Sequence, residues 1–447
     1  MNQNKILYWS ITVALAGFLF GFDTVVISGA NLPIKELWQT DPWFHGTFIM
    51  SMALWGTVVG ALFGGIPCDA YGRKKTLFWI GILYLVSALG SALAPNPYVF
   101  SFFRFIGGVG VGASSVAAPV YISEITSAKN RGQMVALYQF NIVLGIFIAF
   151  ISNYLLQGVG GEADWRWMLG VEAIPAVIYV LMVLGVPNSP RWLVLKKGDN
   201  QAALEVLRAI DPNEAENKLA EIQGDSLDKK SNESVFAKKY SLPLTLAFLL
   251  AFFNQLSGIN FVLYYAPEIL EKAGLATAES LFSSISIGGI NLLFTLLGMY
   301  LIDRLGRKQL MYIGSIGYIL SLAAVAYGFY YASSSTFLLT FILMFIASHA
   351  IGQGAVIWVF ISEIFPNEVR GAGMAFGSGT HWVFAALITL LTPVFIDADQ
   401  GIFGDNPWPV FAFFSVGMIF QLLFVAFMMP ETKGVSLEEL KRKLVKE

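Results

Sequence analysis

Charged side chains are scarce in this chain of 447 residues: they make up 13%, against about 25% in an ordinary globular protein. The net charge of −2 leaves no broad basic surface for nucleic acid. Cys68 is the single cysteine, which excludes an intramolecular disulfide and a cysteine metal cluster. The three histidines are scattered, and the sequence shows neither a His/Glu metal motif nor a nucleophile–base pair. We therefore predict no enzyme activity, no cofactor and no metal site.

Apolar residues are correspondingly abundant. They make up 56% of the chain, and the mean hydropathy is +0.65. A soluble protein of this size could not hide so much apolar surface, so we expect the chain to lie in a membrane. A spanning helix needs about 20 mainly apolar residues. Twelve candidate segments begin near Tyr8, Phe44, Thr76, Tyr98, Gln133, Trp167, Leu242, Leu281, Leu310, Phe337, Ala372 and Trp408.

The loops between these segments differ in their content of lysine and arginine. One set of loops carries most of these residues, and such an excess marks the cytoplasmic side. Both termini are therefore predicted to be cytoplasmic, and the short loops favour a bacterial inner membrane. We predict an N-terminal six-helix bundle over residues 1–186 and a cytoplasmic helical linker over 187–241. A C-terminal bundle over 242–430 and a cytoplasmic tail helix over 431–447 follow.

Acidic and basic residues recur in the same order in the two halves, at predicted cytoplasmic helix ends. Helix capping and the lysine and arginine bias would explain any single copy. A repeat of the whole order is typical of transporters with a site between two halves. We predict that these residues form ion pairs that hold the halves together while the cytoplasmic side is closed. They are Asp69, Arg73, Glu124 and Arg131 in the first half, and Asp303, Arg307, Glu363 and Arg370 in the second.

With the segments 187–192, 255–260 and 430–434, these motifs resemble the sugar porter family of the major facilitator superfamily. The resemblance covers almost the whole chain. It implies an all-α membrane protein with the major facilitator fold, in which twelve transmembrane helices form two pseudo-symmetric six-helix bundles. It also implies alternating access and a monosaccharide substrate. We expect the protein to be a monomer surrounded by lipid.

Two charged residues fall inside predicted spans, where a charge is costly and marks a functional site by default. At about 1.5 Å per residue, Asp23 in the first span and Arg104 in the fourth lie at the same depth, about 9 Å below the outer edge. A static pair would only fix the packing of the helices. In a proton site, ionised Asp23 would hold Arg104 and protonated Asp23 would release it. The aspartate resembles that of the family's proton symporters, so we predict the proton as coupling ion.

Sugars need uncharged hydrogen-bonding groups and flat apolar faces, and the spans supply both. Each amide alone could equally form an interhelical hydrogen bond, and each tryptophan could be core. Most of the chosen positions match sugar contacts of the family, and Ser257 with Gly258 predicts a locally broken helix. The predicted sugar-binding residues are Phe20, Gln139, Gln255, Asn260, Asn291, Trp358, His381 and Trp382.

Some positions depart from the family pattern. Asn254 stands where the family commonly has a glutamine, and His381 stands where an amide is more usual. Asn188 replaces a common glutamate, and the segment before Trp358 lacks a proline. These departures leave the identity of the sugar open. Two other functions stay open as well: a facilitative sugar uniporter, in which Asp23 and Arg104 are structural, and a transporter of a polyol or another small polar solute. A sugar sensor is typical of chains with long signalling tails, which this sequence does not show.

Overall fold

The computed structural model describes residues 3–126, 131–225, 233–366, 368–404, 406–435 and 437–445. Within these ranges every regular element is helical, and eleven helical segments are long and apolar enough to cross a membrane. The bent pair Pro42–Met50 and Met52–Phe63, with an angle of 41° at its break, supplies a twelfth span. The prediction of an all-α membrane protein with twelve spans is confirmed.

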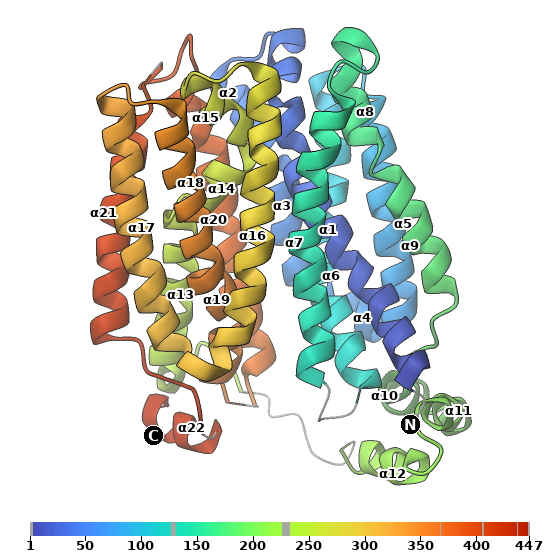
Figure 1. The fold of residues 1–447 in the computed structure, drawn as a ribbon. Coiled ribbons are helices and arrows are strands. Elements are labelled where there is room, and N and C mark those ends of the chain that lie inside the picture. The colour runs from blue at the N-terminus through green and yellow to red at the C-terminus, as the bar shows by residue number, and fades with distance from the viewer. Residues whose placement is uncertain are drawn as a thin grey trace.

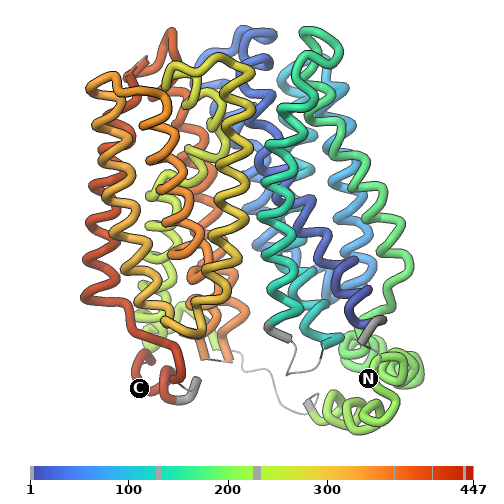
Figure 2. Tube along the Cα trace, viewed as in Figure 1, coloured from blue at the N-terminus to red at the C-terminus, as the bar shows by residue number. Residues whose placement is uncertain are grey.

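The spanning helices form two groups that lie side by side (Figures 1 and 2). The first group, coloured blue to green, contains α1 (Gln3–Trp38), α2 (Pro42–Phe44), η1 (His45–Met50), α3 (Met52–Phe63), α4 (Gly65–Tyr71), α5 (Arg73–Ala92), α6 (Pro97–Ile125), α7 (Arg131–Leu156), α8 (Asp164–Gly170) and α9 (Ala173–Leu184). The second group, coloured from yellow-green to red, contains α13 (Ser241–Leu256), α14 (Ile259–Tyr264), α15 (Ala266–Lys272), α16 (Thr277–Leu305), α17 (Arg307–Tyr330), α18 (Ser335–His349), η5 (Ala350–Gly354), α19 (Ala355–Ile364), α20 (Arg370–Ile396) and α21 (Trp408–Phe427).

Shorter helices gather at one end of the two groups, where α1 also begins (Figure 1). They are α10 (Pro190–Trp192), η3 (Leu193–Lys197), α11 (Asn200–Ile210), α12 (Ala215–Asp225), η4 (Lys238–Tyr240) and α22 (Leu437–Leu444). We call this the linker end and the opposite end the outer end. The last helix of the first group ends at Leu184 and the first helix of the second begins at Ser241, close to the predicted limits of the linker.

The seventh span is broken, as the sequence predicts. α13 ends at Leu256 and α14 begins at Ile259, with Gly258 between them at a φ of +81°. Only glycine adopts such a conformation without strain, and an added Cβ would lie 2.6 Å from the ring of Phe414. After the break, α14 contacts α1 of the first group and α20 of its own group.

The tenth span is irregular where the expected proline is missing. A π-helical turn, η5, separates α18 from α19, and such turns often lie at functional sites. Within this turn the side-chain amide of Gln353 donates a hydrogen bond to Gln421 of α21, which in turn donates to Ser315 at 2.8 Å. These hydrogen bonds hold the π-helical turn against α21. That turn positions the start of α19, which carries Trp358.

The two groups meet along three contacts. α7 packs against α16 and α3 against α20, while α1 approaches α14 and α15. Side chains on α1 and α14 consequently lie between the groups.

Candidate functional site

The ion pair predicted between the first and fourth spans is present. Nη1 of Arg104 donates to Oδ1 of Asp23 at 2.5 Å, and Nη2 donates to the backbone oxygen of Asp23 at 3.0 Å. Each residue is only 1% exposed. The guanidinium thus clamps α6 to the side chain and the backbone of α1, and loss of the Asp23 charge would weaken one of the two contacts.

A second carboxyl, which the sequence analysis missed, faces this pair. Glu172 directly precedes α9, is 1% exposed, and interacts electrostatically with both Asp23 and Arg104. Within the described part of the chain, Oδ2 of Asp23 and Oε1 of Glu172 accept from no donor group, and the two carboxyls lie close enough to share a hydrogen bond when one of them carries a proton. Two buried carboxylates beside one guanidinium leave one negative charge in excess, which a single bound proton removes. The available signal was a single acidic residue inside the apolar run 167–184.

A cluster of polar and aromatic side chains lies between the two groups. Nε2 of Gln255 lies 3.1 and 3.3 Å from the two ring nitrogens of His381. The His381 ring lies 5.0 Å from the Trp358 ring and 4.7 Å from the Trp382 ring, measured between centroids. Phe20 of α1 packs on Trp382 at 5.6 Å. The structure therefore brings together five of the predicted sugar-binding residues, from four different spans.

Three buried polar atoms in this region lack a hydrogen-bond partner among the described residues. They are Oε1 of Gln255, Nδ2 of Asn260 and Nε1 of Trp382. Leaving such an atom unsatisfied costs about 1–3 kcal/mol. The acceptor of Gln255 and the indole N–H of Trp382, beside flat rings, suit a ligand with several hydroxyl groups and apolar CH faces. Asn254 accepts a hydrogen bond from Nε2 of Gln255 at 3.1 Å, so it orients this amide.

The other predicted sugar contacts lie on neighbouring helices. Gln139 is partly exposed on α7, and Asn291 is buried on α16. In the described residues we find no hydrogen bond from Gln139, Asn260 or Asn291 to the cluster around His381. Their role in binding stays a prediction.

The arginines of the repeated motifs form ion pairs inside each group. Arg73 lies 3.1 Å from Asp69 and 3.0 Å from Glu124, both in the first group. In the second group Arg307 lies 3.1 Å from Asp303 and 2.7 Å from Glu363. In this conformation these pairs hold helices within a half. The predicted pairs between the halves belong to the state with its cytoplasmic side closed, so that arrangement stays a prediction.

The other two arginines of the repeated motifs are Arg370 and Arg131. Nε of Arg370 donates to the backbone oxygen of Phe365 at 3.2 Å, and its Nη2 has no partner in the described residues. Arg370 therefore does not form the predicted ion pair in this conformation. The side chain of Arg131 is outside the described part of the chain.

The segments 187–192 and 430–434 dock on these loops, one in each half. Nε1 of Trp192 donates to the backbone oxygen of Asp69 at 3.0 Å. Glu431 accepts hydrogen bonds from the backbone N–H groups of Arg307 and Lys308, each at 3.0 Å, and thereby caps α17. The linker and the C-terminal segment are thus tied to the half that each follows.

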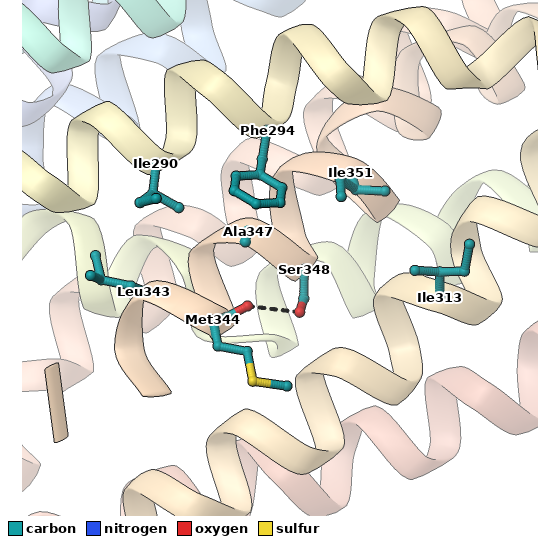
Figure 3. Close-up of a pocket in the computed structure, with 8 residues that line it drawn as sticks. All are labelled: Ile290, Phe294, Ile313, Leu343, Met344, Ala347, Ser348 and Ile351. Carbon is teal, nitrogen blue, oxygen red and sulfur yellow. Dashed lines mark hydrogen bonds between the residues drawn. The ribbon is translucent and has the colours of Figure 1, made fainter. Parts of the chain in front are cut away.

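The cavity in Figure 3 is a different feature from this cluster. Its lining residues come from α16, α17, α18 and η5, and they are Ile290, Phe294, Ile313, Leu343, Met344, Ala347, Ser348 and Ile351. The hydroxyl of Ser348 already donates to the backbone oxygen of Met344 at 2.7 Å. Ile313 and Met344 are exposed. An apolar groove of this kind on a spanning helix suits contact with lipid and offers no partner to a sugar.

Comparison with known proteins places the chain among transporters. A family model described as "Sugar (and other) transporter" matches residues 9–444. The "Probable metabolite transport protein CsbC" of Bacillus subtilis is 38% identical, and the match covers 97% of this chain and 93% of that protein. The "Arabinose-proton symporter" of B. subtilis is 34% identical over 100% of this chain and 96% of its own length. One similar solved structure is described as the inward open conformation of the xylose transporter XylE from E. coli. It matches with a TM-score of 0.85 and 30% identity, over 99% of this chain and 100% of that chain.

Proposed function

Since the chain belongs to the sugar (and other) transporter family, we propose that it is a proton-coupled monosaccharide symporter that works by alternating access. The observation that carries the proposal is the buried Asp23–Arg104 pair with a second carboxyl beside it. A uniporter needs no ionisable group at this depth, where the burial of charge is costly.

The sugar site is the cluster around Gln255, His381, Trp358 and Trp382, which Phe20 closes from the other half. Its unsatisfied amide and indole groups would pair with sugar hydroxyls, and the rings would cover the CH faces. A pentose or a hexose fits this chemistry. The relative named an arabinose-proton symporter and the structures described as a xylose transporter support a monosaccharide of this size.

The coupling step follows from charge balance at Asp23. One proton on the Asp23–Glu172 pair neutralises the excess charge next to Arg104, and a proton on Asp23 itself weakens the clamp between α1 and α6. α1 also carries Phe20, three residues before Asp23, which lies against Trp382. Proton binding and sugar binding therefore act on the same helix, which gives a direct route for coupling.

Location and assembly are part of the same proposal. We place the protein in a bacterial inner membrane as a monomer, with the linker end and both termini in the cytoplasm. The arginine- and lysine-rich loops at the linker end support this orientation.

The test is transport by purified protein in liposomes, with a panel of labelled pentoses and hexoses and an imposed inward proton gradient. Accumulation above equilibrium that requires the gradient is the expected result, and it names the sugar. Uptake that stops at equilibrium with and without the gradient would make the protein a uniporter. If no sugar is taken up and a polyol is, the proposed substrate would be a polyol and not a monosaccharide.

A further inference from the structure

A polar network that the proposed mechanism does not use joins the two groups at their outer end. Nδ2 of Asn31 on α1 donates to Oε2 of Glu268 on α15 at 2.8 Å. One turn further along α1, Lys35 forms an ion pair with Asp397, which directly follows α20. Both contacts cross from the first group to the second, and Figure 1 shows α2 and α15 at this same end.

A histidine fixes the orientation of the bridging amide. Nε2 of His45 lies 2.7 Å from Oδ1 of Asn31, and Nδ1 of His45 lies 2.8 Å from the hydroxyl of Thr40. Because Oδ1 of Asn31 accepts, the histidine donates from Nε2, and this leaves the other side of the amide to donate to Glu268. His45 and Asn31 are 1% and 2% exposed, so neither is a freely moving surface group.

Close backbone packing accompanies these bonds. η1 crosses α20 where a Cβ on Gly46 would lie 2.0 Å from the backbone oxygen of Leu390. The halves are therefore in direct contact at the outer end, whereas the ion pairs of Arg73 and Arg307 at the linker end stay within one half. This asymmetry corresponds to a molecule closed on the outside, in agreement with its similarity to an inward open structure.

The polar contacts follow one stripe on each helix. Thr24, Asn31 and Lys35 share one face of α1, by the spacing of a helix. The hydroxyl of Tyr264 lies beside Thr24, and Glu268 lies one turn beyond Tyr264. Tyr264 also interacts electrostatically with Arg104 and Asp23, so the stripe approaches the buried ion pair.

We propose that the Asn31–Glu268 hydrogen bond and the Lys35–Asp397 ion pair form an outer lock, which must break whenever the transporter opens to the outside, and that protonation of Glu268 strengthens this lock. The inference goes beyond the proposed function: it needs alternating access but neither a particular sugar nor proton coupling at Asp23.

The effect of pH follows from the surroundings of Glu268 in the locked state. Lys35 and Asn31 face it from α1, Lys272 from its own helix, and Asp397 from the end of α20, while His45 contacts it only through Asn31. Burial raises the pKa of Glu268 to about 7, and the two lysines and the Asn31 hydrogen bond oppose this shift.

Opening of the lock would expose the carboxyl to water and return its pKa to about 4.3. The proton is thus bound more tightly in the locked state. The added stability of the lock is complete below the pKa of the open state and is lost as pH rises through about 7. Acid outside the cell therefore favours the locked, inward-facing transporter, and mildly alkaline conditions favour outward opening.

The experiment measures exposure of the outer path with a thiol reagent that does not cross membranes. In a Cys68→Ser background, Ser28→Cys places the only thiol on α1 between Thr24 and Asn31, at a site that is 3% exposed in the locked state. Intact cells are labelled from outside, so the reagent reaches this thiol only through an open outer side. Neither sugar nor a proton gradient is required, so failure of the lock is distinguishable from failure of the symport proposal.

Glu268→Ala should increase the labelling rate by about threefold or more, because the locked state loses its bond to Asn31. Lys35→Asp and Asp397→Lys should each do the same, and the double variant with the charges exchanged should return to the slow rate. Equal rates in the parent and in all single variants would overturn the lock. The charge exchange also shows that faster labelling of the single variants does not come from misfolding, because the slow rate returns only if the protein folds and the ion pair forms again.

Glu268→Gln is the matched variant for the proton. Its amide oxygen still accepts from Asn31, but it does not titrate. Labelling of the parent, divided by that of Glu268→Gln at the same pH, should rise about threefold or more between about pH 6 and about pH 8. The division removes the pH dependence of the thiol itself. A ratio that does not change with pH would overturn the role of the proton.

Discussion

Arg104 binds Asp23 twice, through the carboxylate at 2.5 Å and through the backbone oxygen at 3.0 Å. Only the first of these contacts depends on the charge of the aspartate. A proton on Asp23 would therefore loosen the junction of α1 and α6 without freeing the arginine completely. This is a suitable property for a coupling site, because a complete loss of partners would leave a buried, uncompensated guanidinium at a cost of about 3–5 kcal/mol.

Replacement of Asp23 by asparagine should abolish accumulation of sugar above equilibrium while sugar exchange continues. The amide is similar in size and cannot carry the negative charge. Uphill uptake and exchange are measured in the same liposomes. Accumulation that survives in Asp23→Asn would remove Asp23 from the coupling mechanism.

Glu172→Gln provides a contrast with Asp23→Asn. If the proton of the resting state resides on Glu172, the neutral glutamine mimics that state and transport continues at a rate similar to that of the parent. Its dependence on pH should change, because glutamine cannot bind a proton beside Asp23 and Arg104. The pH profile of exchange checks this, and a profile identical to that of the parent would contradict a role for Glu172.

Gln255→Ala should weaken sugar binding by about 1–3 kcal/mol, or about 5- to 150-fold in Kd. The loss arises because the sugar hydroxyl loses its partner and His381 loses the N–H that faces it. Ser348→Ala is the control, since this hydroxyl bonds only within its own helix and lines the apolar groove. Binding measured by calorimetry should be unchanged in the control. Equal affinity in Gln255→Ala and the parent would move the sugar site elsewhere.

Gly258→Ala should destabilise the protein. The left-handed backbone conformation alone costs about 1–2 kcal/mol for alanine, and the new Cβ would meet the ring of Phe414 at 2.6 Å. Gly289→Ala is the control, because a Cβ there meets Phe147 only at 3.5 Å. Thermal unfolding in detergent should show a lower Tm for the first variant and little change for the second. A Tm equal in both variants would mean that the break in the seventh span does not depend on Gly258.

The two carboxylates that bind Arg307 should contribute unequally. The side chain of Asp303 is 82% exposed and that of Glu363 is 23% exposed. Asp303→Asn should cost less than about 1 kcal/mol, as is usual for an exposed pair. Glu363→Gln should cost about 1.5–3 kcal/mol, because Arg307 and Thr432 both lose a charged acceptor. Chemical denaturation of the two variants in parallel checks the order, and a larger effect in Asp303→Asn would contradict it.

Much of the fold could be predicted because its causes are local. Apolar segments of about 20 residues are long enough to span a bilayer, and the structure has helices at these segments. The break at Gly258 was visible in the same way, since a glycine between polar residues in an apolar run weakens a helix. The pairing of Asp23 with Arg104 was predictable from depth alone, because each helix advances by a fixed rise per residue.

Other parts of the site depended on contacts that the sequence does not encode locally. Glu172 was overlooked because its distance to Asp23 depends on how the sixth span packs beside the first. The partners of these arginines in this conformation also depend on packing: Arg73 and Arg307 each pair with a carboxylate in their own half, and Arg370 donates to a backbone oxygen. The outer lock was not predicted, since Asn31, Glu268 and Asp397 lie far apart in the chain.

The sequence by itself determined the membrane location, the number of spans, the repeat of two halves and the residue types available for sugar and proton. These properties follow from the amino-acid composition, the length of the apolar segments and the spacing of charged residues, which are all visible in short stretches of the sequence. Only the tertiary structure decided which of those residues meet, and at which end the halves touch. The reason is that an ion pair or hydrogen bond depends on distances of about 3 Å, and these are set by the packing of helices from distant parts of the chain.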